Sequence, residues 1–267
     1  AEAPFRISVE RDGRKKPLLL FGNAPEIDAP RPGDPNVVYF APGVHRPGKI
    51  MLTDDQTLYL AGGAVVKGCV HAKGKNITIR GRGVLAGEES PRFQGPGRYL
   101  LDCQDCQNLA VRDIILRNPW SWTFVTWNCD GVVIDNVKIC GSRMINDDAL
   151  DLVNTQNATV RNCFFRTQDD SIAIKGLAKM PRPCENILIE DCEFWTDVAN
   201  IFRIFKNIQV VGEQGSFRGL LYMLGDSPKH SVSRLLFENL TYFGQSVTQD
   251  SPRVHIGPHV ADVVFRN

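Results

Sequence analysis

The chain has 267 residues, with 31 basic and 30 acidic side chains and a formal net charge of +1. This balance excludes the strong uniform field that proteins use to bind nucleic acids or charged membrane surfaces. No apolar run approaches the roughly 18 residues of a membrane-spanning helix. We therefore expect no nucleic-acid partner and no membrane insertion.

The N-terminal residues 1–35 are rich in Pro and differ from the rest of the chain. This segment, which contains the polar run 9–16, predicts an appended strand or hairpin followed by a Pro-rich connector from Ala24 to Pro35. We predict an accessory segment, 1–35, that caps a larger domain of residues 36–267. We also expect a secreted or periplasmic location, although the chain as given contains no signal peptide.

A short pattern recurs along the larger domain. Each copy begins with Asn or a small residue and continues with alternating apolar residues, and the copies begin at Asn76, Asn108, Gly131, Asn157, Asn186, Ser233 and Ala261. The first five starts are separated by 32, 23, 26 and 29 residues. Runs of period two that are closed by Gly, Asn or Asp indicate short strands separated by turns.

Units of this size cannot bury their own apolar faces, so they must stack on one another. We predict an all-β fold, a single-stranded right-handed parallel β-helix in which neighbouring coils lie about 4.8 Å apart. Equivalent residues of successive units should line its interior, namely Ile114, Val137, Cys163, Cys192 and Leu240. Short polar residues at the turns should bond to neighbouring backbone and need no further role. These are Asn76, Asn108, Asn157, Asn186, Asp113 and Asp191.

Three aspartates carry the strongest functional signal. Asp169 and Asp170 follow Asp148 by 21 and 22 residues, which is close to one period, so they should lie beside it on the next coil. Carboxylates this close repel one another, a cost more typical of functional sites than of decoration. One carboxyl with a raised pKa can protonate a leaving oxygen while an ionised one draws a proton from water. Hydrolysis of a glycosidic bond needs such a pair.

Two motifs around these aspartates resemble those of glycoside hydrolase family 28, the polygalacturonases and their relatives. Residues 146–152, Asn-Asp-Asp-Ala-Leu-Asp-Leu, resemble the family's Asn-Thr-Asp-Gly-x-Asp-Ile motif. Residues 168–174, Gln-Asp-Asp-Ser-Ile-Ala-Ile, resemble its Gln-Asp-Asp-Cys-Ile-Ala-Ile motif at the family's spacing. Residues 39–45 and 58–68 are similar to the first coils of bacterial members and of the related family 49 dextranases.

The resemblance implies hydrolysis of a pectin-type or related polysaccharide or oligosaccharide with inversion, without a metal or other cofactor. It assigns Asp170 as the general acid, and Asp148 and Asp169 as the residues that hold and activate water. We expect a monomer whose substrate contacts come from Asn146, Asp151, Gln168, Lys175, Asn200, Arg203 and Trp122. Lys175 has two open interpretations, because it could face an anionic sugar or pair with the surplus carboxylates.

The chain departs from the family pattern after residue 196. Asn200 stands where the family has a histidine, and residues 203–206, Arg-Ile-Phe-Lys, match the family's Arg-Ile-Lys clamp only in composition. The next unit also lacks room for its first strand. We predict that a segment is omitted between Ile204 and Phe205, so that their Cα atoms lie more than about 3.8 Å apart.

Eight cysteines invite a metal or disulfide hypothesis. Cys103 and Cys106 have zinc-like spacing, but no second pair completes a site. One disulfide between neighbouring coils stays open. Two other functions also stay open, a polysaccharide lyase that uses a basic group and Ca²⁺ on the same fold, and a non-catalytic sugar-binding solenoid. The sugar, endo or exo action and the oligomeric state are not specified by the sequence.

Overall fold

The computed structural model describes residues 5–11, 17–141, 144–177, 182–196, 206–210, 221–223, 232–242, 245–252 and 254–266. All regular secondary structure within these ranges is β-strand. The chain divides into two compact units, residues 1–31 and residues 32–267. No helix with the length and hydropathy of a membrane span occurs in the described part of the chain.

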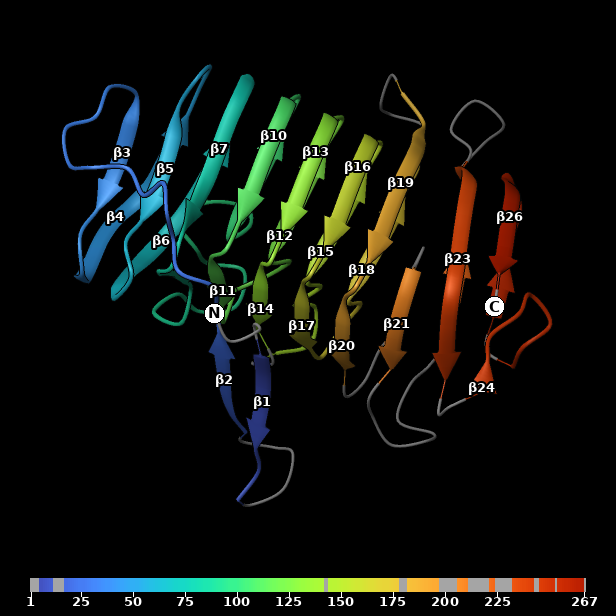
Figure 1. Cartoon of the computed structure of the whole chain (residues 1–267). Helices are drawn as coiled ribbons and strands as arrows, with labels where there is room; N and C mark the ends of the chain where they lie inside the picture. The colour runs from blue at the N-terminus through green and yellow to red at the C-terminus, as the bar shows by residue number, and fades with distance from the viewer. Residues whose placement is uncertain are drawn as a thin grey trace. The chain divides into compact units, whose positions relative to one another are not determined.

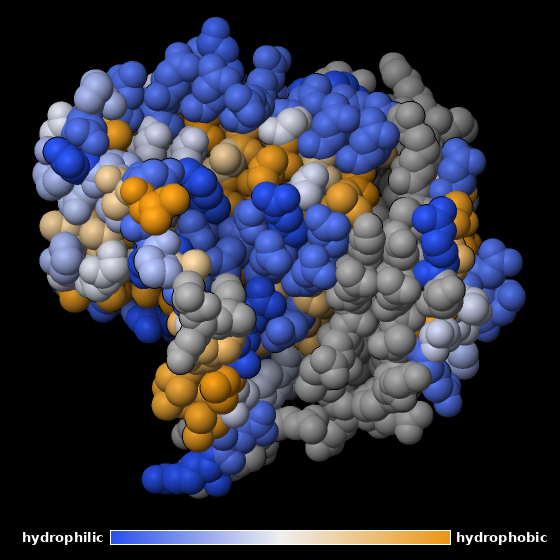
Figure 2. Space-filling view, viewed as in Figure 1, coloured by the Kyte–Doolittle hydropathy of each residue, from blue (hydrophilic) through white to orange (hydrophobic). Residues whose placement is uncertain are grey.

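The first unit contains an antiparallel hairpin of β1 (Phe5–Val9) and β2 (Leu18–Gly22). Apolar residues alternate along β1 and are continuous from Leu18 to Phe21 in β2. The register pairs Val9 with Leu18 and Ile7 with Leu20. These side chains are exposed, and Figure 2 shows an orange apolar patch on the hairpin. The role of this segment as a cap stays a prediction.

The second unit is a parallel β-helix whose strands form three stacks along its axis (Figure 1). The sequence-based prediction of this fold is confirmed. We call the stacks A, B and C in the order in which each coil visits them. Stack A contains β3 (Val37–Phe40), β5 (Thr57–Leu60), β7 (Lys75–Gly81), β10 (Gln107–Arg112), β13 (Asp130–Asp135), β16 (Gln156–Arg161), β19 (Cys184–Glu190), β23 (Val232–Tyr242) and β26 (Val260–Arg266).

Stack B runs beside stack A. It contains β4 (Gly43–Leu52), β6 (Ala64–Ala72), β8 (Val84–Ala86), β11 (Ile115–Arg117), β14 (Lys138–Cys140), β17 (Phe164–Thr167), β20 (Glu193–Thr196) and β21 (Lys206–Val210). The long strand β6 continues into stack C, because its last residues pair with β9. Stack C then contains β9 (Leu101–Gln104), β12 (Phe124–Trp127), β15 (Leu150–Val153) and β18 (Ile172–Lys175).

Three shorter strands lie late in the chain. β22 (Leu221–Met223) and β25 (Val254–Ile256) form a separate parallel pair, and β24 (Gln245–Ser246) pairs antiparallel with the end of β23. The predicted omission between Ile204 and Phe205 falls outside the described residues, so it stays a prediction.

The core fills the interior between the three stacks. One column of stack A joins directly paired residues of successive coils, Ile79, Val111, Ile134, Val160 and Ile189, and all are buried. Four of the five predicted interior residues, Ile114, Val137, Cys163 and Cys192, are also buried. The burial of Leu240 lies outside what the structure describes. All eight cysteines are free thiols, and the seven other than Cys140 are buried, which is consistent with small apolar core residues.

Asparagines at the start of stack A strands form a ladder along one corner of the solenoid. Asn76, Asn108, Asn157 and Asn186 all adopt positive φ angles of 51–58°, a conformation that Asn tolerates better than most residues. Their side-chain amides bond from coil to coil, as Asn108 Nδ2 does to Asn76 Oδ1 at 2.9 Å and Asn186 Nδ2 to Asn157 Oδ1 at 2.9 Å. These residues therefore stabilise the turns through side chains of neighbouring coils, and not through the neighbouring backbone that we predicted.

Replacement of Asn157 tests this ladder. Asn157→Ala loses the bonds to Asp130 (2.7 Å) and Asn186 and must keep a φ of 51°, so we expect a loss of about 1–3 kcal/mol in the free energy of unfolding. Asn157→Gly loses the same bonds without the backbone strain, so it should be less destabilised. Denaturant unfolding measures both, and a glycine variant less stable than the alanine variant would contradict this account.

Candidate active site

The register of stack C brings the predicted catalytic residues together. Leu150 pairs with Phe124 on one side and with Ile172 on the other. Asp148 and Asp170 each lie two residues before these paired positions, and the Ala149 N–H donates to the Asp170 carbonyl at 2.9 Å. The two aspartates therefore occupy the same place on adjacent coils, at the N-terminal ends of β15 and β18.

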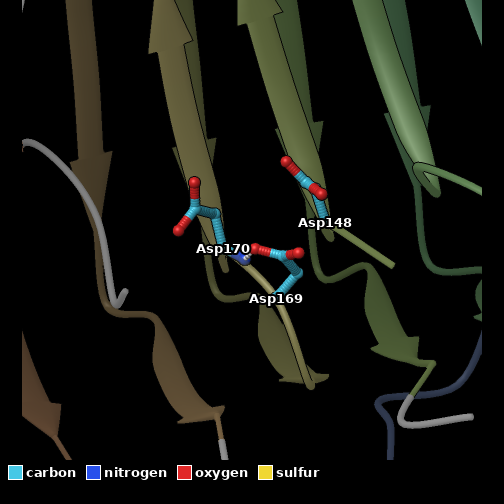
Figure 3. A group of neighbouring side chains, drawn as sticks. All are labelled: Asp148, Asp169 and Asp170. Carbon is cyan, nitrogen blue, oxygen red and sulfur yellow. Dashed lines mark hydrogen bonds between the residues drawn. The ribbon is translucent and has the colours of Figure 1, made fainter. Parts of the chain in front are cut away.

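The three carboxyl groups gather at this edge of the stack (Figure 3). One carboxylate oxygen from each of Asp148, Asp169 and Asp170 lies within 4.8 Å of the others. Asp148 has only 4% of its surface exposed, whereas Asp169 and Asp170 are half-buried. The triplet thus borders solvent on one side and the packed face of stack C on the other.

Asp147 has a different task from its neighbour Asp148. It is fully buried, and its Oδ1 accepts hydrogen bonds from Thr167 Oγ1 at 2.8 Å, the Gln168 N–H at 2.8 Å and the Asp169 N–H at 3.1 Å. These three donors belong to the turn that carries Asp169 and Asp170. Asp147 therefore positions the second motif, and Asp148 is the first-motif aspartate that joins the triplet.

Asp169 is held by backbone donors at both of its oxygens. Its Oδ1 accepts from the Asp170 N–H at 2.9 Å, and its Oδ2 accepts from the Asn146 N–H at 3.0 Å. The backbone N–H of Asn146 thus supports Asp169, and that of Gln168 supports Asp147. The predicted contact of both residues with substrate stays a prediction. The two motifs support each other across the coil boundary.

Lys175 pairs with the carboxylates at the end of β18. Its Nζ donates to Asp151 Oδ1 and lies 3.4 Å from Asp148 Oδ2. Of the two interpretations left open by the sequence, the structure favours pairing. Asp151 was predicted to contact substrate, but its exposed fraction is 0%. It instead serves as the buried partner of Lys175, because β15 directs it beneath the surface of stack C.

Burial and mutual charge shift the ionisation of this cluster. Burial, followed by the charge of Asp151, raises the pKa of Asp148 to about 8, and Lys175 opposes that shift. Burial also raises the pKa of Asp151 to about 6, again against Lys175. The pKa of Lys175 is raised, because Asp151 and Asp148 outweigh the opposing effect of its burial. For both aspartates, burial is the largest cause of the raised pKa, ahead of the charges of their neighbours.

Trp122 is enclosed on both ring faces. Tyr99 stacks on it with centroids 5.2 Å apart and planes 6° apart, and Lys175 Nζ lies 3.6 Å from the ring centroid. The Tyr99 ring and the Lys175 ammonium group cannot occupy the same face of Trp122, so they cover opposite faces. Trp122 is half-buried. Because both of its ring faces are covered, they are not open for stacking on a sugar, and its predicted contact with substrate stays a prediction.

Tyr99 is a site residue that sequence reasoning missed. Leu101 pairs with Phe124, so Tyr99 and Trp122 each precede their strands by two residues, as Asp148 and Asp170 do. These four residues form one column along the axis, which we call the site column. The sequence repeats were aligned on the strands of stack A. Aligning them on the strands of stack C would have placed Tyr99 in this column. The predicted contacts Asn200 and Arg203 lie outside the described residues.

The triplet is also the place where a cation could bind. Among the described residues, it is the group whose carboxylate oxygens are close enough to share an ion. Ca²⁺ takes about six to eight oxygen ligands, so water or substrate would have to complete its shell. Cys103 and Cys106 belong to no such group within the described ranges.

Solved structures with similar folds are enzymes and related proteins of low sequence identity. A family 28 exopolygalacturonase from Yersinia enterocolitica matches with a TM-score of 0.65 and 16% identity, over 99% of this chain and 71% of its own. A polygalacturonase from Erwinia carotovora ssp. carotovora matches with a TM-score of 0.53 and 19% identity, over 62% and 57%. Dex49A from Penicillium minioluteum matches with a TM-score of 0.51 and 13% identity, over 94% and 59%.

No curated protein sequence matches the chain. A family model does match it, over residues 66–196, which include both aspartate motifs and all of stack C from β9 to β18. The resemblance stated from the motifs is thereby confirmed over this segment, which matches Glycosyl hydrolases family 28.

Proposed function

We propose that the protein is a glycoside hydrolase that cleaves a galacturonan-type polysaccharide at the Asp148, Asp169 and Asp170 triplet. The observation that carries the proposal is the meeting of three carboxyl groups within 4.8 Å at one edge of stack C. The family match over residues 66–196 and the polygalacturonases among the similar structures support this reaction and substrate class.

In this proposal the three carboxyl groups have separate roles. Asp170 protonates the leaving glycosidic oxygen as general acid. Asp148 and Asp169 hold the attacking water between them. Asp169, fixed by two backbone N–H donors, accepts the proton of that water with its remaining lone pairs. Asp148, with a pKa of about 8, is mostly neutral at pH 7 and orients the water as a hydrogen-bonding group.

Single displacement is the stereochemical course that these environments favour. The triplet is more compact than the roughly 6.5–9.5 Å that separates acid from base in most inverting enzymes, and nearer the roughly 5–5.5 Å of retaining ones. Retention, however, requires an ionised carboxylate that is free to attack the sugar. Asp148 is mostly neutral near pH 7, and both oxygens of Asp169 are engaged by backbone amides. Neither is therefore well placed as a nucleophile.

The fate of the anomeric centre tests this course. We expect the first-formed reducing end to have the configuration opposite to that of the cleaved bond, because water attacks directly. Proton NMR during the first minutes of hydrolysis, before mutarotation, distinguishes the anomers. A first product of unchanged configuration would contradict single displacement and point to a covalent intermediate.

Removal of the proposed acid should stop hydrolysis. We expect Asp170→Asn to lower reducing-end release from polygalacturonate by about 10²–10⁴-fold, which is the usual contribution of a general acid. Asp54→Asn serves as the matched control, because Asp54 lies in an exposed turn far from the triplet in the sequence. This variant should retain activity. Unchanged activity of Asp170→Asn would contradict the assignment, and absence of activity in both the wild type and the control would favour a non-catalytic solenoid.

The lyase alternative has a distinct signature on the same samples. A lyase would release unsaturated products that absorb ultraviolet light, and chelation of Ca²⁺ would abolish the reaction. Hydrolysis predicts reducing ends without that absorbance and without sensitivity to a chelator.

The raised pKa of Asp148 should make the protein less stable as pH rises. The folded state holds this proton up to about pH 8, whereas the unfolded chain releases it near pH 4. Between these values the folded state binds more protons, so its stability falls with increasing pH. Asp148→Asn removes the effect, and we expect its stability relative to the wild type to increase by about 1 kcal/mol or more from pH 5 to pH 8. Thermal unfolding at both pH values measures this, and a constant difference would contradict it.

A further inference from the structure

Arg98 directly precedes Tyr99, and its exposed side chain lies over two aromatic rings. Its Cζ atom is 4.9 Å from the centroid of Tyr99 and 5.1 Å from that of Trp127. Both rings are buried, and their centroids lie 6.4 Å apart in a stacked arrangement. The guanidinium group thus stacks on a packed pair of aromatic rings, Tyr99 and Trp127. This contact reduces its conformational freedom before any ligand binds.

This aromatic pair lies on the face of stack C that carries the triplet. Tyr99 lies in the site column with Trp122, Asp148 and Asp170, and Trp127 ends the strand β12 of the same stack. Burial raises the pKa of Tyr99 to about 12, with Arg98 opposing the shift and Asp148 among the charges that add to it. Arg98 and Asp148 therefore have opposite effects on the pKa of the same tyrosine.

Among the described residues, two other cations near stack C already have carboxylate partners. Lys175 is paired with Asp151, and Arg182 Nη1 lies 3.2 Å from Asp130 Oδ2. Arg98 contacts the two rings but forms no hydrogen bond or ion pair with any other residue in the described ranges. An arginine stacked by its flat face still offers the N–H groups of its edge, which match a carboxylate in bidentate geometry.

We propose that Arg98 is a specificity-determining residue that binds the carboxylate of a uronate residue in the bound polysaccharide. The inference rests on the proposed function, because it specifies the charge of the substrate that the same site accepts. A sugar chain that runs along the site column from Asp170 passes Asp148 and Trp122 before it reaches Tyr99 and Arg98. The acidic cluster repels an anionic substrate, and a cation outside that cluster offsets the repulsion.

Substitution of Arg98 tests the site with charged and uncharged ligands. We expect Arg98→Gln to raise KM for polygalacturonate about tenfold, with kcat changed by less than about twofold, because a contact made equally in the ground and transition states affects binding alone. Arg98→Lys keeps the positive charge but lacks the paired N–H donors of the guanidinium group. Its KM should therefore lie between those of the wild type and Arg98→Gln. Binding of fully methyl-esterified oligogalacturonate, measured by calorimetry, should be the same for all variants.

Arg92 provides the matched control. It is an exposed arginine in the same loop, and its Cζ lies 4.7 Å from the centroid of the exposed Phe93 ring. Arg92→Gln removes an equivalent charge and an equivalent ring contact, and we expect its KM to match that of the wild type. Circular dichroism and melting temperature check that the Arg98 variants remain folded.

The experiment separates this inference from the proposed function. Normal hydrolysis with an unchanged KM in Arg98→Gln would overturn the role of Arg98 and leave the hydrolase proposal intact, and so would an equal loss of affinity for the esterified ligand. If the wild type cleaves no polymer, calorimetry with oligogalacturonate decides. Binding that depends on Arg98 would then support the uronate site and contradict the hydrolase, whereas no binding by the wild type would overturn the inference.

Discussion

Hydrogen bonding between successive parallel coils is the constraint on which the site depends. Residues 21 and 22 positions apart in the sequence become neighbours only because Leu150 is paired with Ile172. In a strand, a slip of one residue exchanges the two faces. Such a slip in β18 would turn Lys175 toward the interior and Ile174 toward the surface, and Asp151 would lose its buried partner. The core columns and the asparagine ladder thus fix the register on which the triplet relies.

The site brings several carboxyl groups into a buried environment, which disfavours their charged form. Two buried aspartates are accommodated in different ways: Asp147 by hydroxyl and amide donors of the adjacent turn, and Asp151 by the ammonium of Lys175. Within the described ranges, the Asp148 carboxyl accepts only the 3.4 Å bond from Lys175, and burial, followed by the charge of Asp151, raises its pKa. Asp151 Oδ2 is also buried without a hydrogen-bond partner among the described residues. Destabilised groups of this kind are a common compromise between stability and activity.

Period and motif predicted the fold and the triplet, because both are properties of spacing. The repeat of short apolar runs implied stacking, and stacking implied that Asp148 meets Asp169 and Asp170.

The direction of individual side chains on stack C was harder to predict. All four residues of β12 are buried, and so are all four of β15, so alternation does not indicate which face points outward. For this reason Asp151 and Trp122 were predicted to meet substrate, whereas one is sealed and the other is covered on both faces. Arg98 and Tyr99 lie in a loop without a recognisable motif, and only the register of stack C places them.

The site column also has a modular character. Each coil contributes one member, first Tyr99, then Trp122, Asp148 and Asp170, and neighbouring members are separated by one strand spacing. Duplication or loss of a whole coil upstream of Asp148 would lengthen or shorten the binding surface by one step while leaving the acids in contact. Under the proposed function, the number of coils would set the length of polymer that is bound, independently of the acids that cleave the bond.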